Sequence, residues 1–175
     1  MFSRRRLVRI IALASLVFLA GCGGGSSAAK DSAALKSIDD RFAIQVGDRT
    51  VQMQIAAEAT EMQKGLMFRE TMGADEGMLF IYEAPQQMSF WMRNTKLPLD
   101  IGYFDATGEL KEIYPLYPFD ERTVASRAKN LQFALEMNQG WYQQAGVKPG
   151  AKLDLKAVAA GLKARGIKPE SVGLK

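Results

Sequence analysis

Apolar and polar residues alternate along much of the middle of the chain, as in strands with one buried face. Residues 42–46 and 50–56 alternate in this way on either side of Gly47-Asp48, so the sequence predicts a hairpin. A second hairpin is predicted from residues 99–104 and 109–114 across a four-residue turn. Further strands are predicted at residues 78–82, 89–92, 133–137 and 152–155.

Two short helices interrupt the predicted strands. Thr60 and Gln63 have the spacing of a capping box at the start of the first, and the second covers residues 141–145. Seven or so short strands with two small helices predict a mostly β fold, α+β at the margin, arranged as a compact antiparallel β-barrel or sandwich. We expect one globular domain at residues 39–156, followed by a basic peripheral tail at 157–175.

The start of the chain has the pattern of a bacterial lipoprotein signal. Four arginines lie within residues 4–9, and an apolar stretch too short to span a bilayer comfortably follows. Residues 19–22, Leu-Ala-Gly-Cys, resemble the lipobox, in which the cysteine thiol accepts a diacylglycerol. We therefore expect a signal peptide at residues 1–21, lipid attachment at Cys22 and a flexible Gly/Ser/Ala tether at residues 22–38.

The predicted location is the cell envelope, with the chain held to membrane through the lipid on Cys22. By resemblance to the lipoprotein sorting rule, Gly23 after the cysteine favours the outer membrane, facing the periplasm, if the cell has one. The sequence leaves open whether export uses the Sec or the Tat route, and it leaves the oligomeric state open.

Composition excludes several kinds of function. The net charge of +4 comes from the four arginines of the predicted signal, and the rest of the chain has 19 basic and 19 acidic side chains. A nearly neutral mature chain argues against a nucleic-acid partner. The chain has no His and one Cys, which excludes a Ser-His-Asp triad, a Cys-His pair and a zinc site of imidazoles and thiolates. We expect neither a cofactor nor a metal.

Three groups of motifs carry a family resemblance. They are residues 65–69 with 77–80, residues 90–95 with 97–101, and residues 134–138 with Gly146-Val147 and Gly150. In this order and spacing they resemble the family known as domain of unknown function 192, over about residues 42–155. The resemblance implies a small β-rich fold and no established activity, so function has to be argued from the site.

Charged residues inside apolar strand sequence are the first candidates for a site, because burying an unpaired charge costs several kcal/mol. Arg69, Asp100 and Glu136 fit this description. If their strands face one cleft, Asp100 and Glu136 converge as an acid and base pair of the glycosidase kind. The alternative is structural, with Arg69 paired to one of the two carboxylates.

Other candidates surround these three. Trp91 or Trp141 could form a stacking platform for a sugar, and Arg93 and Asn94 could supply polar contacts. Eight methionines besides Met1 lie between residues 53 and 137. Thioethers can hold Cu(I), and they also fill irregular cores.

Three functions follow from these candidates. The leading hypothesis is a non-catalytic binding or accessory module of the cell envelope, whose ligand is a glycan, a peptide or another envelope protein. The alternative is a carboxylate-dependent hydrolase that acts on cell-wall glycans through Asp100 and Glu136. The third is Cu(I) binding by methionines. The sequence does not decide whether the protein is an enzyme, although the missing His and Cys favour a non-catalytic role.

Overall fold

The computed structural model describes residues 34–174. Within them the chain forms eight strands, three α-helices and one 3-10 helix. The strands are β1 (Phe42–Val46), β2 (Arg49–Ala56), β3 (Glu76–Gln86), β4 (Ser89–Phe90), β5 (Leu99–Asp105), β6 (Leu110–Leu116), β7 (Val124–Ala125) and β8 (Leu131–Asn138). The helices are α1 (Ala59–Lys64), α2 (Trp141–Ala145), α3 (Leu155–Ala164) and the 3-10 helix η1 (Pro169–Val172). The predicted signal peptide, Cys22 and most of the predicted tether lie outside the described residues.

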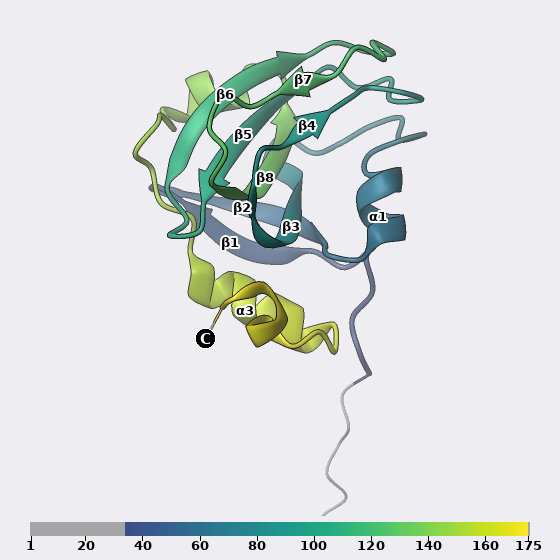
Figure 1. Ribbon diagram of the computed structural model, residues 1–175. Coiled ribbons are helices and arrows are strands. Elements are labelled where there is room, and N and C mark those ends of the chain that lie inside the picture. The colour runs from purple at the N-terminus through teal and green to yellow at the C-terminus, as the bar shows by residue number, and fades with distance from the viewer. Residues whose placement is uncertain (1–33, 175) are drawn as a thin grey trace, which may run out of the picture. The chain divides into compact units, whose positions relative to one another are not determined.

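A curved six-stranded sheet organises the domain, in the order β1-β2-β3-β8-β5-β6 (Figure 1). The strands β4 and β7 form a separate two-stranded sheet. The prediction of a mostly β fold is confirmed. The barrel alternative is wrong, because the edge strands β1 and β6 do not pair. A purely antiparallel arrangement is also wrong, because β2 and β3 are parallel and α1 lies in the crossover between them.

Both predicted hairpins are present, as β1–β2 and β5–β6. The strand predicted at residues 152–155 is reduced to two isolated bridges. Leu153 bridges Val46 at the end of β1, and Lys152 bridges Glu109 beside the β5–β6 turn. Residues 152 and 153 therefore pair with the chain near both edges of the sheet, but they do not close the sheet into a barrel.

The sheet carries a hydrophobic core on each face, so its central strands are buried on both sides. On one face, which we call the helix-side core, α2, α3 and η1 pack against the sheet. On the other, which we call the loop-side core, residues from connecting loops pack beside β4 and β7. Strand β8 shows the result, since seven of its eight residues are buried. Its sequence, LQFALEMN, therefore does not alternate strictly between apolar and polar residues.

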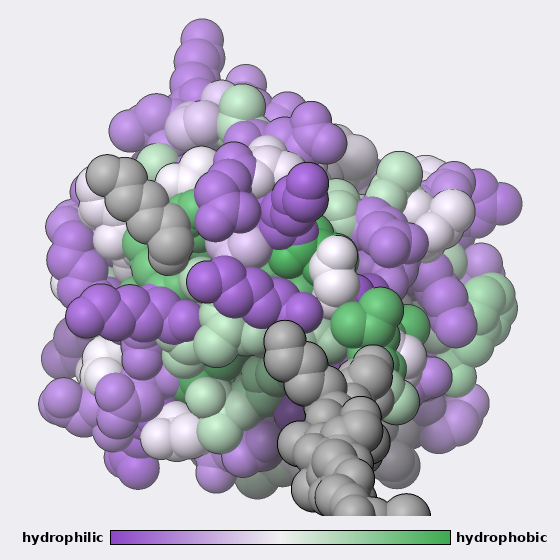
Figure 2. Space-filling view, turned by 90° about the horizontal axis from the view of Figure 1, so that it is seen from below, coloured by the Kyte–Doolittle hydropathy of each residue, from purple (hydrophilic) through white to green (hydrophobic). Residues whose placement is uncertain are grey.

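The prediction of a peripheral tail at residues 157–175 is wrong. Asp154 caps α3 by accepting hydrogen bonds from the backbone N–H groups of Lys156 and Ala157, at 3.0 and 3.1 Å. The helix then buries Val158 and Leu162 in the helix-side core. Seen from the side on which α3 lies, the visible surface is mainly hydrophilic, and apolar side chains show in small separate areas (Figure 2).

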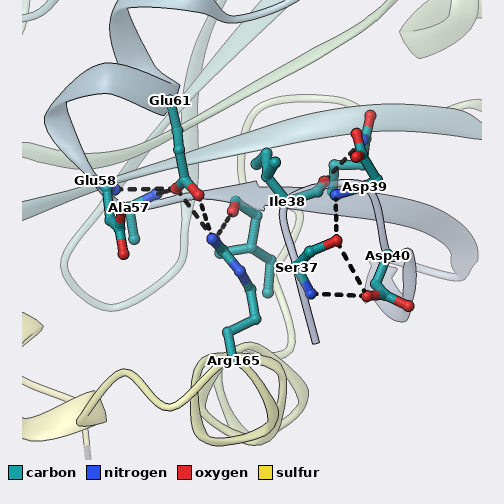
Figure 3. Close-up of polar contacts among 10 residues, drawn as sticks. Ser37, Ile38, Asp39, Asp40, Ala57, Glu58, Glu61 and Arg165 are labelled. Atoms are coloured by element: carbon teal, nitrogen blue, oxygen red, sulfur yellow. Dashed lines mark hydrogen bonds and ion pairs between the residues drawn. The ribbon is translucent and has the colours of Figure 1, made fainter. Parts of the chain in front are cut away.

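Arg165, just after α3, reaches across to the start of α1 (Figure 3). Its guanidinium donates to the Glu61 carboxylate and to the Ile55 carbonyl oxygen, and only 5% of the Arg165 side chain is exposed. Glu61 also accepts from the backbone N–H groups of Ala57 and Glu58. Burial alone would raise the pKa of Glu61, but these hydrogen bonds outweigh it and hold that pKa below its ordinary value. The start of α1 is thus fixed at Glu58 rather than at the predicted Thr60.

Candidate functional site

Three loops lie side by side and are tied together by their backbones. They are residues 65–69, 91–95 and 117–120, and we call them the three-loop surface. The Phe68 N–H donates to the Asn94 carbonyl oxygen at 2.9 Å, and the Phe119 N–H donates to the Thr95 carbonyl oxygen at 3.1 Å. Phe68, Asn94 and Phe119 are the three non-glycine residues with positive φ among the described residues, at 62°, 53° and 60°. This conformation is strained for L-residues, and such strain clusters at functional sites.

Large aromatic side chains project from this surface into solvent. Among the described residues, five large hydrophobic side chains are exposed, and four of them belong to these loops. They are Phe68 (71% exposed), Trp91 (40%), Tyr117 (58%) and Phe119 (62%). The Arg93 guanidinium carbon lies 5.6 Å from the centroid of the Trp91 ring, in a cation–π contact. Exposed aromatic clusters with a polar rim are typical of interaction sites on monomeric proteins.

A cavity of about 320 Å³ opens between α1 and the three-loop surface, and we call it the aromatic groove. Its walls include three predicted site residues, Trp91, Arg93 and Asn94. A smaller cavity of about 30 Å³, which we call the inner cavity, shares Gln63, Lys64, Met67 and Trp91 with the groove. A fourth predicted site residue, Glu136, lines it. The structure therefore brings four of the six candidates to one place.

Glu136 is buried without a partner. Only 4% of the residue is exposed, and the carboxyl makes no hydrogen bond or ion pair with any described residue. Burial raises the pKa of Glu136 to about 8. Most buried polar groups in proteins are hydrogen-bonded, so an unpaired acid next to a cavity suggests a missing partner.

Asp100 lies on the opposite face of the sheet. In the pairing of β5 with β8, Asp100 is opposite Met137 and Ile101 is opposite Glu136. Residues directly opposite each other share a face, and Met137 belongs to the helix-side core whereas Ile101 belongs to the loop-side core. The condition for convergence of the two carboxylates, strands that face one cleft, is therefore not met.

The surroundings of Asp100 are structural. Its Oδ2 accepts a hydrogen bond from the Gly140 N–H at 2.7 Å, ahead of α2. Burial raises the pKa of Asp100, and this hydrogen bond offsets part of the rise. Trp141, the other tryptophan considered as a sugar platform, is only 6% exposed and donates from Nε1 to Asp75 at 2.9 Å. Asp100 and Trp141 therefore stabilise the structure around α2.

Arg69 pairs with neither carboxylate. It is half-buried, and burial together with the charge of Arg41 lowers its pKa from the ordinary value. The structural alternative, an ion pair of Arg69 with Asp100 or Glu136, is therefore wrong as well. Arg69 instead lines a separate cavity of about 460 Å³, together with Asp39 and Gln54.

The methionines are divided between the two cores. Met53 and Met137 lie in the helix-side core, whereas Met78, Met88 and Met92 lie in the loop-side core. Met62 and Met72 also pack against the loop-side core, so five of the eight methionines lie on that side of the sheet and two on the other. Within residues 34–174, no group of three or more Asp, Glu, His or Cys side chains is arranged to hold a metal ion. None of the helices described is long and apolar enough to cross a membrane.

Comparison with known proteins gives the family. The model of DUF192 (uncharacterized ACR, COG1430) matches residues 42–155, which is more than half of the chain. The chain belongs to the DUF192 family. No curated protein matches this DUF192 chain.

Two solved structures resemble the DUF192 domain, both with a TM-score of 0.63. One is a protein of unknown function from Novosphingobium aromaticivorans DSM 12444, at 32% identity over 75% of this chain and 99% of that chain. The other is a Sinorhizobium meliloti 1021 protein proposed to be a transcription regulator, at 28% identity over 65% of this chain and 92% of that chain. The Novosphingobium chain is almost completely covered, so its crystal structure has about the extent of the domain described here.

The sequence reasoning missed three residues of the three-loop surface, Phe68, Tyr117 and Phe119. The sequence contains evidence for two of them. In Tyr117-Pro118-Phe119, two aromatic residues flank a proline in a segment without the apolar–polar alternation of a strand. Aromatic residues in a predicted loop have no core to enter, so they are candidates for contact with a partner.

Proposed function

We propose that this DUF192 domain is a non-catalytic binding module of the cell envelope, anchored through a lipid on Cys22, that holds a peptide segment of a partner in the aromatic groove. The observation that carries the proposal is the set of four exposed aromatic rings on three cross-tied, strained loops. Loops fixed in this way lose little conformational entropy on binding, which favours affinity.

A peptide fits this surface better than a glycan does. Trp, Tyr and Arg are the residue types enriched at binding hot spots, and all three occur here as Trp91, Tyr117 and Arg93. Arg93 already covers one face of the Trp91 ring, which leaves less of the ring for a stacked sugar. Phe68 in the wall of the groove is apolar and suits side chains of a peptide.

The other two functions have weaker support. Glycoside hydrolysis needs two carboxyl groups on either side of one bond, roughly 5 to 9.5 Å apart in a shared site. Asp100 and Glu136 face opposite sides of the sheet, so they do not meet this requirement. Cu(I) binding needs several accessible thioethers at one point, and Met78, Met88 and Met92 of the loop-side core are at most 2% exposed, as core residues are.

A peptide display library tests the binding proposal directly. The domain from Ala34 onward is immobilised, and enriched random peptides are measured against the parent and against Trp91→Ala. We expect Trp91→Ala to weaken binding about 30-fold, the loss typical of a central aromatic hot spot. Leu35→Ala is the matched control, because Leu35 is 71% exposed and lies outside the three-loop surface. The proposal is wrong if no peptide is enriched, or if the enriched peptides bind Trp91→Ala as tightly as the parent.

Lipid attachment needs its own experiment on the full chain. Cells expressing the parent and supplied with labelled palmitate should yield a labelled protein in the membrane fraction, because acyl chains contribute about 0.8 kcal/mol per buried methylene. Cys22→Ala should abolish the label, whereas Ser26→Ala, four residues further on, should retain it. A labelled Cys22→Ala protein would place the lipid elsewhere.

A further inference from the structure

The inner cavity has apolar walls and a single acid. Its apolar wall residues are Met62, Leu66, Met67, Phe80, Phe90 and Trp91. Glu136 comes from the central strand β8 behind them, and its carboxyl has no partner among the described residues. The shared residues Gln63, Lys64, Met67 and Trp91 line both cavities, so the inner cavity adjoins the wider aromatic groove. A side chain that enters from the groove would pass apolar walls before it meets a carboxyl.

This arrangement matches the chemistry of lysine. A lysine side chain is a flexible four-carbon stem that carries a compact ammonium with three donors. The apolar residues that the inner cavity shares with the groove, Met67 and Trp91, suit the stem, and Glu136 suits the ammonium. A volume of about 30 Å³ admits a water-sized group, which an ammonium is and a planar guanidinium is not.

We propose that the inner cavity is a lysine pocket, in which the ammonium of a lysine in the bound peptide pairs with the Glu136 carboxylate. The inference rests on the proposed function and names the side chain by which the peptide is anchored. Pairing supplies the partner that the buried acid lacks, so the gain is largest for a ligand that brings a positive charge.

The Glu136 carboxyl has no cationic partner among the described residues, so it can pair with one cation from a ligand. The charge of Glu136 affects the pKa of Tyr82 on β3, Tyr103 on β5 and Tyr142 on α2, and burial raises the pKa of each above its ordinary value. All three therefore stay neutral between pH 6 and 8. Lys64 on α1 is the one charged residue besides Glu136 in the described lining of the cavity. Its ammonium makes no ion pair with Glu136 in the structure, and its flexible stem allows it to compete with a ligand lysine for the carboxylate.

Proton linkage gives this pocket a distinctive pH dependence. With a pKa of about 8, Glu136 is mostly protonated at pH 7, and an ammonium pairs only with the ionised form. Apparent affinity scales with the ionised fraction, so it should rise about 50-fold between pH 6 and pH 8. Lysine itself stays charged in this range, because its ordinary pKa is about 10.4. Binding at pH 7 should release about 0.9 proton to the buffer.

Three small probes test the pocket by NMR titration of the domain from Ala34 onward. They are the Nα-acetyl methylamides of lysine, norleucine and arginine, which share a backbone and differ at the end of the side chain. At pH 8 we expect the lysine probe to bind at least tenfold more tightly than the other two. Glu136→Gln should remove this preference, because it keeps the shape and loses the charge. Asp100→Asn is the matched control on the opposite face of the sheet and should keep the preference.

Two further measurements keep the inference open to refutation if Glu136→Gln folds poorly. Calorimetry of the parent in two buffers of different ionisation enthalpy measures the released proton, and binding without proton release overturns the lysine pocket. Lys64→Met removes the competing ammonium and keeps an apolar stem, so it should tighten binding of the lysine probe. Equal binding of the lysine and norleucine probes would also overturn the inference.

The display library separates this inference from the proposed function. If enriched peptides depend on Trp91 and contain no lysine, the peptide-binding function stands and the lysine pocket is wrong. If no peptide is enriched, the proposed function itself is wrong. A lysine common to the enriched peptides, whose replacement by norleucine costs tenfold or more in affinity, supports both.

Discussion

Replacing Glu136 by Gln should remove most of the pH dependence of folding stability near neutrality. The folded-state pKa of Glu136 is raised to about 8, above its ordinary value of 4.5. Below pH 4.5 both the folded and the unfolded chain hold this proton, and Glu136 contributes no pH dependence. Between pH 4.5 and 8 the folded chain holds the proton and the unfolded chain does not. Unfolding then releases a proton, so the free energy of unfolding falls as the pH rises.

The size of the effect follows from the two pKa values. Each pH unit inside the window lowers the free energy of unfolding by about 1.4 kcal/mol. The change from pH 5.5 to 7.5 is therefore about 3 kcal/mol, a large share of the 5–15 kcal/mol typical of a domain. The chain has no histidine, so no imidazole adds its own pH dependence to the stability in this range. Glu136→Gln carries no titrating proton and should show a nearly flat profile.

Urea unfolding at pH 5.5, 6.5 and 7.5, followed by tryptophan fluorescence, measures both profiles. Glu83→Gln is the matched control, because Glu83 is an exposed carboxyl on the same sheet, in β3. This control should keep the slope of the parent. A parent protein whose stability does not fall over this range would show that Glu136 is ionised in the fold, and the burial argument would fail.

Three other predictions concern the supports of the site. Glu61→Ala leaves the Arg165 guanidinium buried without its anion and should lower the free energy of unfolding by about 3–5 kcal/mol. Arg165→Met should lower it by less, because Glu61 still accepts hydrogen bonds from two backbone N–H groups in that variant. Equal losses for the two variants in urea unfolding would contradict this. Gly102→Ala places a methyl group against the Tyr142 hydroxyl and should lower the free energy of unfolding by about 1–3 kcal/mol in the same assay. An unchanged midpoint of urea unfolding would refute the close contact. Phe119 has a positive φ, which glycine adopts without strain, so Phe119→Gly should raise thermal stability by about 1 kcal/mol. The same variant should weaken peptide binding, because it removes an aromatic ring. A drop in stability would show that the backbone at Phe119 is not strained.

The local pattern of the sequence predicted most strands but not their faces. The alternation around Gly47 and the turn before Glu109 fixed two hairpins, because turn chemistry and apolar periodicity are local. The relative direction of Asp100 and Glu136 depends on the register between β5 and β8, which are far apart in sequence. A shift of one residue would have put both carboxyls on one face. Flanking apolar residues therefore could not decide between a shared cleft and opposite faces.

The end of the chain was misjudged for a different reason. Gly166 and Pro169 suggest a broken tail when they are read only as helix breakers. In the structure, Gly161 lies where a side chain would meet Ile55, so its small size allows α3 to approach the sheet. Gly166 follows the helix with a φ of 76°, and Pro169 begins η1. Each residue has a packing role that appears only once the sheet is in place.

The position of α3 has a consequence for how the protein is made. Every strand of the sheet precedes α3 along the chain, yet the helix-side core needs Val158 and Leu162, and α1 needs Arg165. A ribosome-bound chain that lacks these last residues would expose the apolar face of the sheet and leave α1 without its ionic support. Completion of the helix-side core therefore requires α3 to be synthesised as well as the strands of the sheet. An incomplete product that lacks α3 presents its uncovered core to proteases.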